Sequence, residues 1–290
     1  MDNKRPSMTA YLAAVCRAQH QLLDHPPIFE DPLALKILGQ GNPEAMRANA
    51  ERLNPRRMRG PRAALAVRSR IAEDLLREEV ACGVRQYVIL GAGLDTFAYR
   101  NPYTGNRLTV YEVDHPATQS WKRMLLATAG IACPASMKFV PVDFETERLE
   151  EQLKNAGVAD APAVFSWLGV TMYLRPETVM NTLAGIASRH GPGTTVVFDY
   201  IPDDSALGIV QRMLRRMQQA RFRAMGEPWV GFFNPEQLSM ELTKAGYSDI
   251  RDLGPVEMGD MYLSQRDDGL KVSRTGLRLL GLGRVMIART

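Results

Sequence analysis

Short apolar runs alternate with amphipathic stretches of helical period between residues 85 and 200. In each run the hydrophobic residues are consecutive rather than alternating, which is typical of strands covered on both faces of a parallel sheet. Strands that alternate with helices indicate a doubly wound α/β fold with helices on both faces. The pattern predicts five strands, at residues 86–90, 108–113, 138–142, 162–167 and 194–200.

Helical patterns precede this alternating region. Residues 7–60 are predicted to form N-terminal helices in front of the sheet, where Leu12, Val15 and Cys16 share one helical face. Asp31-Pro32 is expected to open a second, short helix. A longer helix is predicted at 62–80, with apolar residues on one face and charged residues on the other.

The simple alternation stops after Tyr200. Residues 203–223 show the period of one long helix, inserted before a further sheet unit that begins with Asn234 as cap and Pro235 at the first helical position. This insertion (203–225) is a candidate lid. Its apolar positions share a face that we expect to cover a binding site or to pack on the sheet: Val210, Met213, Leu214 and Met217.

The rest of the chain completes one domain. Residues 62–200 form the predicted cofactor-binding core and residues 234–290 complete the sheet, with a last strand near 285–288. At 290 residues with 45% hydrophobic content, a single domain spanning 1–290 is the natural interpretation.

Composition narrows the class of protein. No 18-residue apolar run is present, so no membrane partner is expected. The first residues lack the apolar core of a secretion signal, and the three cysteines are far apart, which favours a cytoplasmic protein with reduced thiols.

The net charge of +4 and the pI near 9.0 raise the question of nucleic acid. The arginines near 212–223 belong to an amphipathic helix, and no nucleic-acid module is recognisable, so such a partner is not expected.

The most specific chemical signal is a glycine turn after the first strand. Gly91 and Gly93 leave room for a ligand to approach the backbone closely, and Asp114 follows the next strand, 114 − 91 = 23 residues later. A glycine turn and an acid in this arrangement can hold an adenosyl ribose. The third glycine of a dinucleotide fingerprint is replaced by Thr96, and Asp95 would repel a pyrophosphate. S-adenosylmethionine, which is cationic, is therefore the favoured ligand.

Four ordered motifs resemble those of the leucine carboxyl methyltransferase family, and most closely its bacterial branch of S-adenosylmethionine-dependent O-methyltransferases, which includes polyketide carboxyl methyltransferases of secondary metabolism. They are VILGAGLDTFAYR (88–100), YEVDHP (111–116), VDF (142–144) and FSWLGVTMYL (165–174). The likeness extends over nearly the whole chain. It implies a mostly parallel, seven-stranded methyltransferase sheet and a small-molecule methyl acceptor.

The resemblance and the motif positions together give a set of candidate cofactor contacts. Asp114 is the expected ribose acid, with Glu112 as competitor on the same side of the strand. The resemblance assigns Asp143 and Phe144 to adenine, and an arginine, Arg68 or its neighbour Arg70, to the methionyl carboxylate. Asp114 or Glu112 could instead cap the helix that follows at Pro116, and Asp143 could cap a helix before Leu149.

The motif at 165–174 departs from the eukaryotic members, which have a glutamate where this chain has Leu168. The backbone of Ser166 or Trp167 could then replace that contact. The resemblance places Tyr173 against the substrate, although it could also be a half-buried structural tyrosine.

Other chemistry is less clearly indicated. None of the four histidines has a metal-ligand spacing, so no metal is expected. His20 is weighed as a base or substrate contact, against the commoner case of a structural histidine. The motif region offers no convincing base. Since a carboxylate acceptor requires no base whereas a hydroxyl does, a carboxylate acceptor is favoured. A nicotinamide oxidoreductase and a non-catalytic adenosyl-binding protein are the alternatives, and the oligomeric state stays open.

Overall fold

Seven strands form one sheet in a computed structural model that describes residues 7–39, 44, 58–103, 108–268, 270 and 283–290. The strand order is β3-β2-β1-β4-β5-β7-β6, and only β7 runs antiparallel to its neighbours. The expected doubly wound methyltransferase sheet is thereby confirmed. The strands are β1 (Gln86–Leu90), β2 (Thr109–Asp114), β3 (Met137–Pro141), β4 (Val164–Trp167), β5 (Thr195–Tyr200), β6 (Asp249–Leu253) and β7 (Arg284–Arg289).

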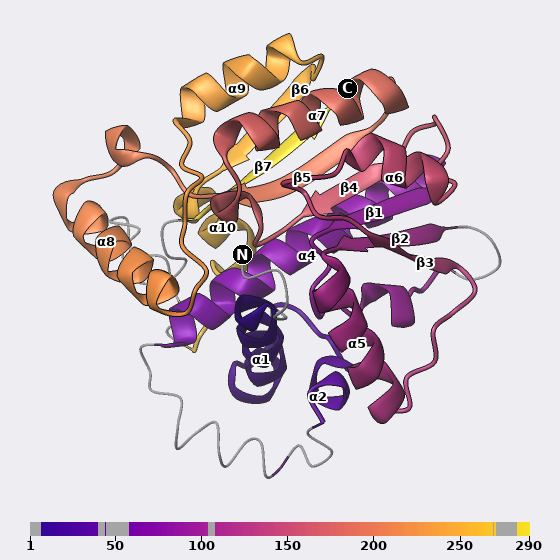
Figure 1. Cartoon of the computed structure of the whole chain (residues 1–290). Helices are drawn as coiled ribbons and strands as arrows, with labels where there is room; N and C mark the ends of the chain where they lie inside the picture. Colours follow the sequence, from indigo (N-terminus) through magenta and orange to yellow (C-terminus); the bar gives the residue numbers. More distant parts are fainter. Residues whose placement is uncertain (1–6, 40–43, 45–57, 104–107, 269, 271–282) are drawn as a thin grey trace.

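Helices cover both faces of the sheet (Figure 1). One face packs against α6 (Leu149–Asn155), α7 (Pro176–His190) and α9 (Pro235–Lys244). The other packs against α4 (Arg59–Ala81), α5 (Pro116–Thr128) and α10 (Pro255–Tyr262). Both faces of the central strands are therefore buried, which explains why their apolar residues are consecutive.

The N-terminal helices lie below the sheet in Figure 1, where α1 (Met8–Leu23) packs against α4. The short helix α2 (Ala34–Ile37) begins two residues after the predicted Pro32. The reason is that the Asp31 side chain does not cap a helix. It accepts hydrogen bonds from Arg17 and from the hydroxyl of Thr96 instead.

One further sequence expectation is corrected. The predicted helix at 203–223 is broken into a 3-10 turn, η4 (Asp204–Ala206), and a helix, α8 (Ile209–Ala224), because Gly208 has extended backbone angles. After Asp95 the chain forms the 3-10 helix η2 (Phe97–Tyr99). Strand β6 was not predicted because it has no apolar run; it is an edge strand in which Asp249 and Arg251 are exposed.

Other boundaries agree with the prediction. Pro176 opens α7 and Gly191, at positive φ, ends it, while the Asn234 side chain caps α9. Among the described residues, no helix is long and apolar enough to cross a membrane.

Candidate functional site

A cavity of about 830 Å³ opens at the carboxyl ends of the parallel strands. Its sheet side is formed by the turns that follow β1, β2, β3 and β4 and by the end of β5. Residues of α1, α4 and α8 close the other sides. This edge is where doubly wound sheets bind ligands, because the loops after the strands splay apart there.

The glycine turn needs its glycines for two reasons. Gly91 and Gly93 have positive φ angles, 67° and 46°, that other L-residues rarely adopt. A Cβ on Gly91 would lie 2.2 Å from a methyl carbon of Val170, and one on Gly93 would lie 3.0 Å from Cβ of Ala10 in α1. The turn is thus packed between the loop after β4 and the N-terminal helix, with its backbone facing the cavity.

Asp114 lies on the cavity wall at the end of β2. Its carboxylate accepts a hydrogen bond from the backbone N–H of Gly93 and another, 2.7 Å long, from that of His115. Burial raises the pKa of Asp114 above its ordinary value. The acid is therefore fixed beside the glycine turn, as the ribose assignment requires.

The competitor Glu112 does not reach the cavity. Its carboxylate lies 2.7 Å from the ammonium of the buried Lys122 and accepts a hydrogen bond from the Tyr99 hydroxyl at 3.1 Å. Burial raises the pKa of Glu112 to about 7, although Lys122 opposes the shift. Glu112 is therefore part of the packing between β2 and α5.

Asp95 and Asp143 both lie on the cavity wall and each caps a turn. The Asp95 carboxylate accepts from the backbone N–H of Phe97 at 2.7 Å, and that of Asp143 accepts from Glu145 at 3.0 Å. Helix α6 begins only at Leu149, so Asp143 is not its cap. Both side chains have further lone pairs available for a ligand.

The aromatic pair after β3 and β4 is divided between cavity and core. Phe144 lines the cavity and stacks on Trp167, with ring centroids 5.8 Å apart. Trp167 is fully buried behind it and is not part of the cavity wall. Ser166 does line the cavity, and its hydroxyl accepts a hydrogen bond from Tyr87 at 2.9 Å.

Arg68 faces the cavity, whereas Arg70 lies outside it and pairs with Asp74 at 2.8 Å. The guanidinium of Arg68 forms an ion pair with Asp199, at the end of β5. A Cβ on Gly169 would lie 2.9 Å from Arg68 Nη2, so this glycine makes room for the guanidinium. The Asp199 carboxylate also accepts from the Gly169 backbone N–H at 2.5 Å.

His20 lies away from the cavity and is fully buried. Its Nδ1 is 3.1 Å from the Asp24 carboxylate, and its Nε2 accepts a hydrogen bond from the backbone N–H of Ile28 at 2.9 Å. Arg62 completes this buried network by pairing with Asp24 at 2.9 Å. We therefore assign His20 a structural role and withdraw it as a candidate base.

Tyr173 borders the part of the cavity that lies next to α1 and α8. It ends the 3-10 helix η3 (Thr171–Tyr173), and burial raises the pKa of its phenol above the ordinary value. The backbone N–H groups of Val230 and Gly231 both donate to the carbonyl of Met172, at 2.8 and 3.0 Å. The chain beyond α8 is thereby attached to this part of the cavity wall.

The inner side of α8 covers the cavity with Gln218, Arg221 and Phe222, and Phe222 stacks on Trp229 at 4.8 Å. This corrects the lid expectation. The apolar face that was expected to form the cover, or to pack on the sheet, points into solvent instead: Val210, Met213, Leu214 and Met217 are exposed. The helix does cover the cavity, with a polar and aromatic face.

Comparison with known proteins identifies the family. The family model for leucine carboxyl methyltransferase matches residues 10–187. The chain belongs to the leucine carboxyl methyltransferase family. YktD of Bacillus subtilis (strain 168), which its name assigns to the S-adenosyl-L-methionine-dependent methyltransferases, is 32% identical over 95% of this chain and 97% of its own length.

More partial relatives carry the same type of name. One from Mycolicibacterium gilvum (strain PYR-GCK) is 34% identical over 60% of this chain and 53% of its own length. A crystal structure of a Thermobifida fusca YX protein assigned to the methyltransferases has a TM-score of 0.57, with 18% identity, over 100% of this chain and 96% of that protein. The predicted family, fold and cofactor are thereby confirmed. The alternative of a nicotinamide oxidoreductase is not supported.

The site of this family member is suited to S-adenosylmethionine. The Arg68–Asp199 pair presents one positive and one negative group to the cavity, which is complementary to an amino-acid zwitterion. Asp114 and Asp143 present carboxylates for hydroxyl and amino donors, and the glycine turn offers bare backbone. Among the described residues, no group of three or more His, Cys, Asp or Glu side chains could hold a metal ion.

Asp199 lines the cavity and was missed by sequence reasoning. It occupies the end of an otherwise apolar strand, at the same sheet edge as Asp114 and Asp143, and that position was a usable signal. Glu227 was missed as well. It is buried and accepts hydrogen bonds from the N-terminal turn of α1, including the Met8 backbone N–H at 2.8 Å, and so joins the end of α8 to α1.

Proposed function

We propose that the protein is an O-methyltransferase that methylates a carboxylate on a small, largely apolar acid. The observation that carries the proposal is the chamber between Tyr173 and α8. Its wall combines apolar side chains with an exposed arginine, Arg221, while the carboxylate of Glu227 is held by the N-terminal turn of α1. Among the described lining residues of α1, η3, α8 and 227–230 there is neither histidine nor lysine. Such a chamber suits an anionic head with an apolar body.

The site residues divide into two groups. We assign Asp114 to the ribose, Asp143 and Phe144 to the adenine, and Arg68 with Asp199 to the amino-acid end of the cofactor. In this assignment Asp199 supplies the carboxylate that the family glutamate provides elsewhere, since Leu168 cannot. Gly91 and Gly93 hold the turn that lets the backbone approach the ligand.

S-adenosylmethionine, when bound, supplies an electrophilic methyl group. The protein's part is to orient an acceptor oxygen and to exclude water. A carboxylate is ionised at neutral pH and needs no base. Tyr173, with its raised pKa, stays protonated and can donate a hydrogen bond to the acceptor. Arg221 attracts the carboxylate from the side of α8.

A paired substrate panel tests this proposal. Purified protein is incubated with methyl-labelled S-adenosylmethionine and a series of apolar carboxylic acids, each matched with the alcohol of the same skeleton. The proposal expects label in the acids only, and a loss of at least about tenfold in kcat/KM for Arg221→Gln with little change in cofactor affinity. Label that enters the alcohols in preference to the acids would refute it.

A further inference from the structure

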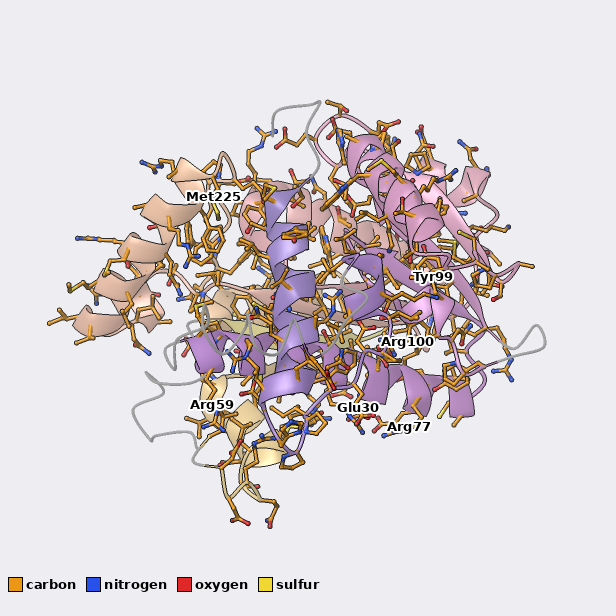
Figure 2. All side chains as sticks on the ribbon, turned by 90° about the horizontal axis from the view of Figure 1, so that it is seen from below. Glu30, Arg59, Arg77, Tyr99, Arg100 and Met225 are labelled. Atoms are coloured by element: carbon orange, nitrogen blue, oxygen red, sulfur yellow. The ribbon has the colours of Figure 1, made fainter. Side chains whose placement is uncertain are left out.

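The outer face of α8 is an exposed apolar stripe on a well-formed helix. Ile209 is 84% exposed, Val210 57%, Met213 64%, Leu214 38% and Met217 61%. Five large hydrophobic side chains in solvent on a single helix are unusual, because exposed hydrophobic residues are normally scattered. In Figure 2, which views the molecule from below, the side chains of α8 extend outwards from the body at the left.

The stripe is bordered by positive charge. Helix α8 contains five arginines and no acidic residue. At 100° per residue, Arg212, Arg216 and Arg223 lie along one edge of the stripe, beside Ile209. All three are exposed.

The orientation of α8 is fixed by contacts on the side opposite to the stripe. The buried Arg215 lies on the opposite side of α8, where its guanidinium pairs with Asp204 at 2.6 Å and donates to the carbonyl of Pro202 at 3.2 Å. Its cationic group also lies over the ring of Phe232, 4.7 Å from the centroid. These contacts hold the apolar stripe outwards instead of allowing it to turn onto the sheet.

We propose that this face, defined by Ile209, Val210, Met213, Leu214 and Met217 with the arginines beside them, docks on an anionic lipid surface. An apolar stripe flanked by basic side chains is the pattern of a helix that lies in the plane of a membrane interface. The apolar groups enter the acyl boundary, while the arginines extend along it to reach lipid phosphates. Such a helix does not span the bilayer, so the lack of an apolar span is no obstacle.

Charge favours a lipid over other occupants. Two copies of this face packed against each other would bring their arginines together without any acid on α8 to compensate. Nucleic acid would neutralise the arginines but would leave the apolar stripe in water. An anionic membrane satisfies both at once.

Vesicle sedimentation tests the proposal without any methyl acceptor, so its result is independent of the proposed activity. The full chain is mixed with vesicles of phosphatidylglycerol and phosphatidylcholine, or of phosphatidylcholine alone. We expect binding to the anionic vesicles that is at least about tenfold stronger and weakens with salt. Equal binding to both, or none to the anionic vesicles, would overturn the proposal.

Two pairs of variants identify the face. Val210→Gln/Met213→Gln/Met217→Gln should lower the vesicle partition at least about tenfold, whereas the control on exposed methionines elsewhere, Met124→Gln/Met240→Gln/Met261→Gln, should not. Arg212→Gln/Arg216→Gln/Arg223→Gln should likewise lose binding, and a variant with the same charge change elsewhere, Arg85→Gln/Arg123→Gln/Arg148→Gln, should retain it.

The same variants detect other occupants. Each is checked by circular dichroism and by sedimentation velocity. If the α8 variants bind vesicles like the wild type, the lipid proposal is wrong. If their only effect is to convert a dimer to a monomer, the lipid proposal is also wrong and the face is a protein surface.

Discussion

Arg68 and Asp199 form an ion pair between α4 and the end of β5, although 131 residues separate them in the chain. Both side chains lie on the cavity wall, and the backbone of Gly169 holds the Asp199 carboxylate from the other side. In the proposed assignment, the pair takes the place of the family glutamate in binding the amino-acid end of the cofactor.

Asp199→Asn should separate binding of the two ends of the cofactor. The amide keeps an oxygen for the Gly169 N–H but loses the charge, so affinity for S-adenosylhomocysteine should fall about 10- to 100-fold. Affinity for 5′-methylthioadenosine, which lacks the amino-acid end, should change less than about threefold. Calorimetry measures both, and Arg70→Gln is the control outside the cavity. An equal loss for both ligands would indicate a general structural defect.

Asp114→Ala should weaken S-adenosylhomocysteine binding by about 10- to 150-fold, because the variant lacks the acceptor for two ribose hydroxyls. Glu112→Ala should have a smaller effect on binding, yet it should lower the free energy of unfolding, since it leaves Lys122 buried without its carboxylate. Titration of the ligand and urea unfolding distinguish these outcomes. The reverse order of the two affinities would overturn the ribose assignment.

Gly91→Ala tests the steric demand of the turn, and Gly130→Ala is its matched control. Both glycines have similar positive φ, 67° and 61°, but a Cβ at Gly130 meets no atom within 4 Å. The control should lose about 1–2 kcal/mol of stability from backbone strain alone. Gly91→Ala adds the clash with Val170 and should lose more than about 3 kcal/mol, measured by urea unfolding. Equal losses would show that the turn can relax.

The structural role assigned to His20 predicts a particular pH dependence. Burial alone would raise the pKa of Asp24, but hydrogen bonds from His20 and Arg62 outweigh it and lower the pKa from 3.8 to about 2. The ionised carboxylate therefore stabilises the fold fully above about pH 4, and this stabilisation is lost as the pH falls towards 2.

Asp24→Asn should accordingly lower the free energy of unfolding by at least about 2 kcal/mol at pH 7, with the difference from wild type shrinking below pH 4. Urea unfolding at pH 7, 5 and 3 measures it. A difference that stays constant down to pH 3 would show that the Asp24 charge is not responsible.

The sequence predicted what depends on local pattern. Continuous apolar runs located the five parallel strands to within one or two residues, and Asn234 and Gly191 marked helix ends correctly. Strand β6 was not predicted, because an edge strand needs no apolar run. The order in which distant strands pair was not predicted, since spacing along the chain does not fix it.

Cavity residues were predictable where an acid ends a strand, as Asp114 does. Spacing could not separate it from Glu112, because their difference arises from Lys122, ten residues further on in α5. The inward face of the candidate lid was predicted wrongly for a related reason. Amphipathicity of α8 was visible, but the buried contacts of Arg215 decide which face turns inwards, and those contacts exist only in the folded chain.

Alkaline release of the label tests the central claim most directly. Protein, methyl-labelled S-adenosylmethionine and an extract of apolar acids are incubated, and the labelled product is treated with mild alkali. A methyl ester hydrolyses and gives volatile labelled methanol, whereas methyl ethers and methylamines retain the label. We predict that the label becomes volatile, and that Arg68→Met and Asp199→Asn reduce its yield while Arg70→Gln does not. Label that remains in the product after alkali would contradict carboxyl methylation.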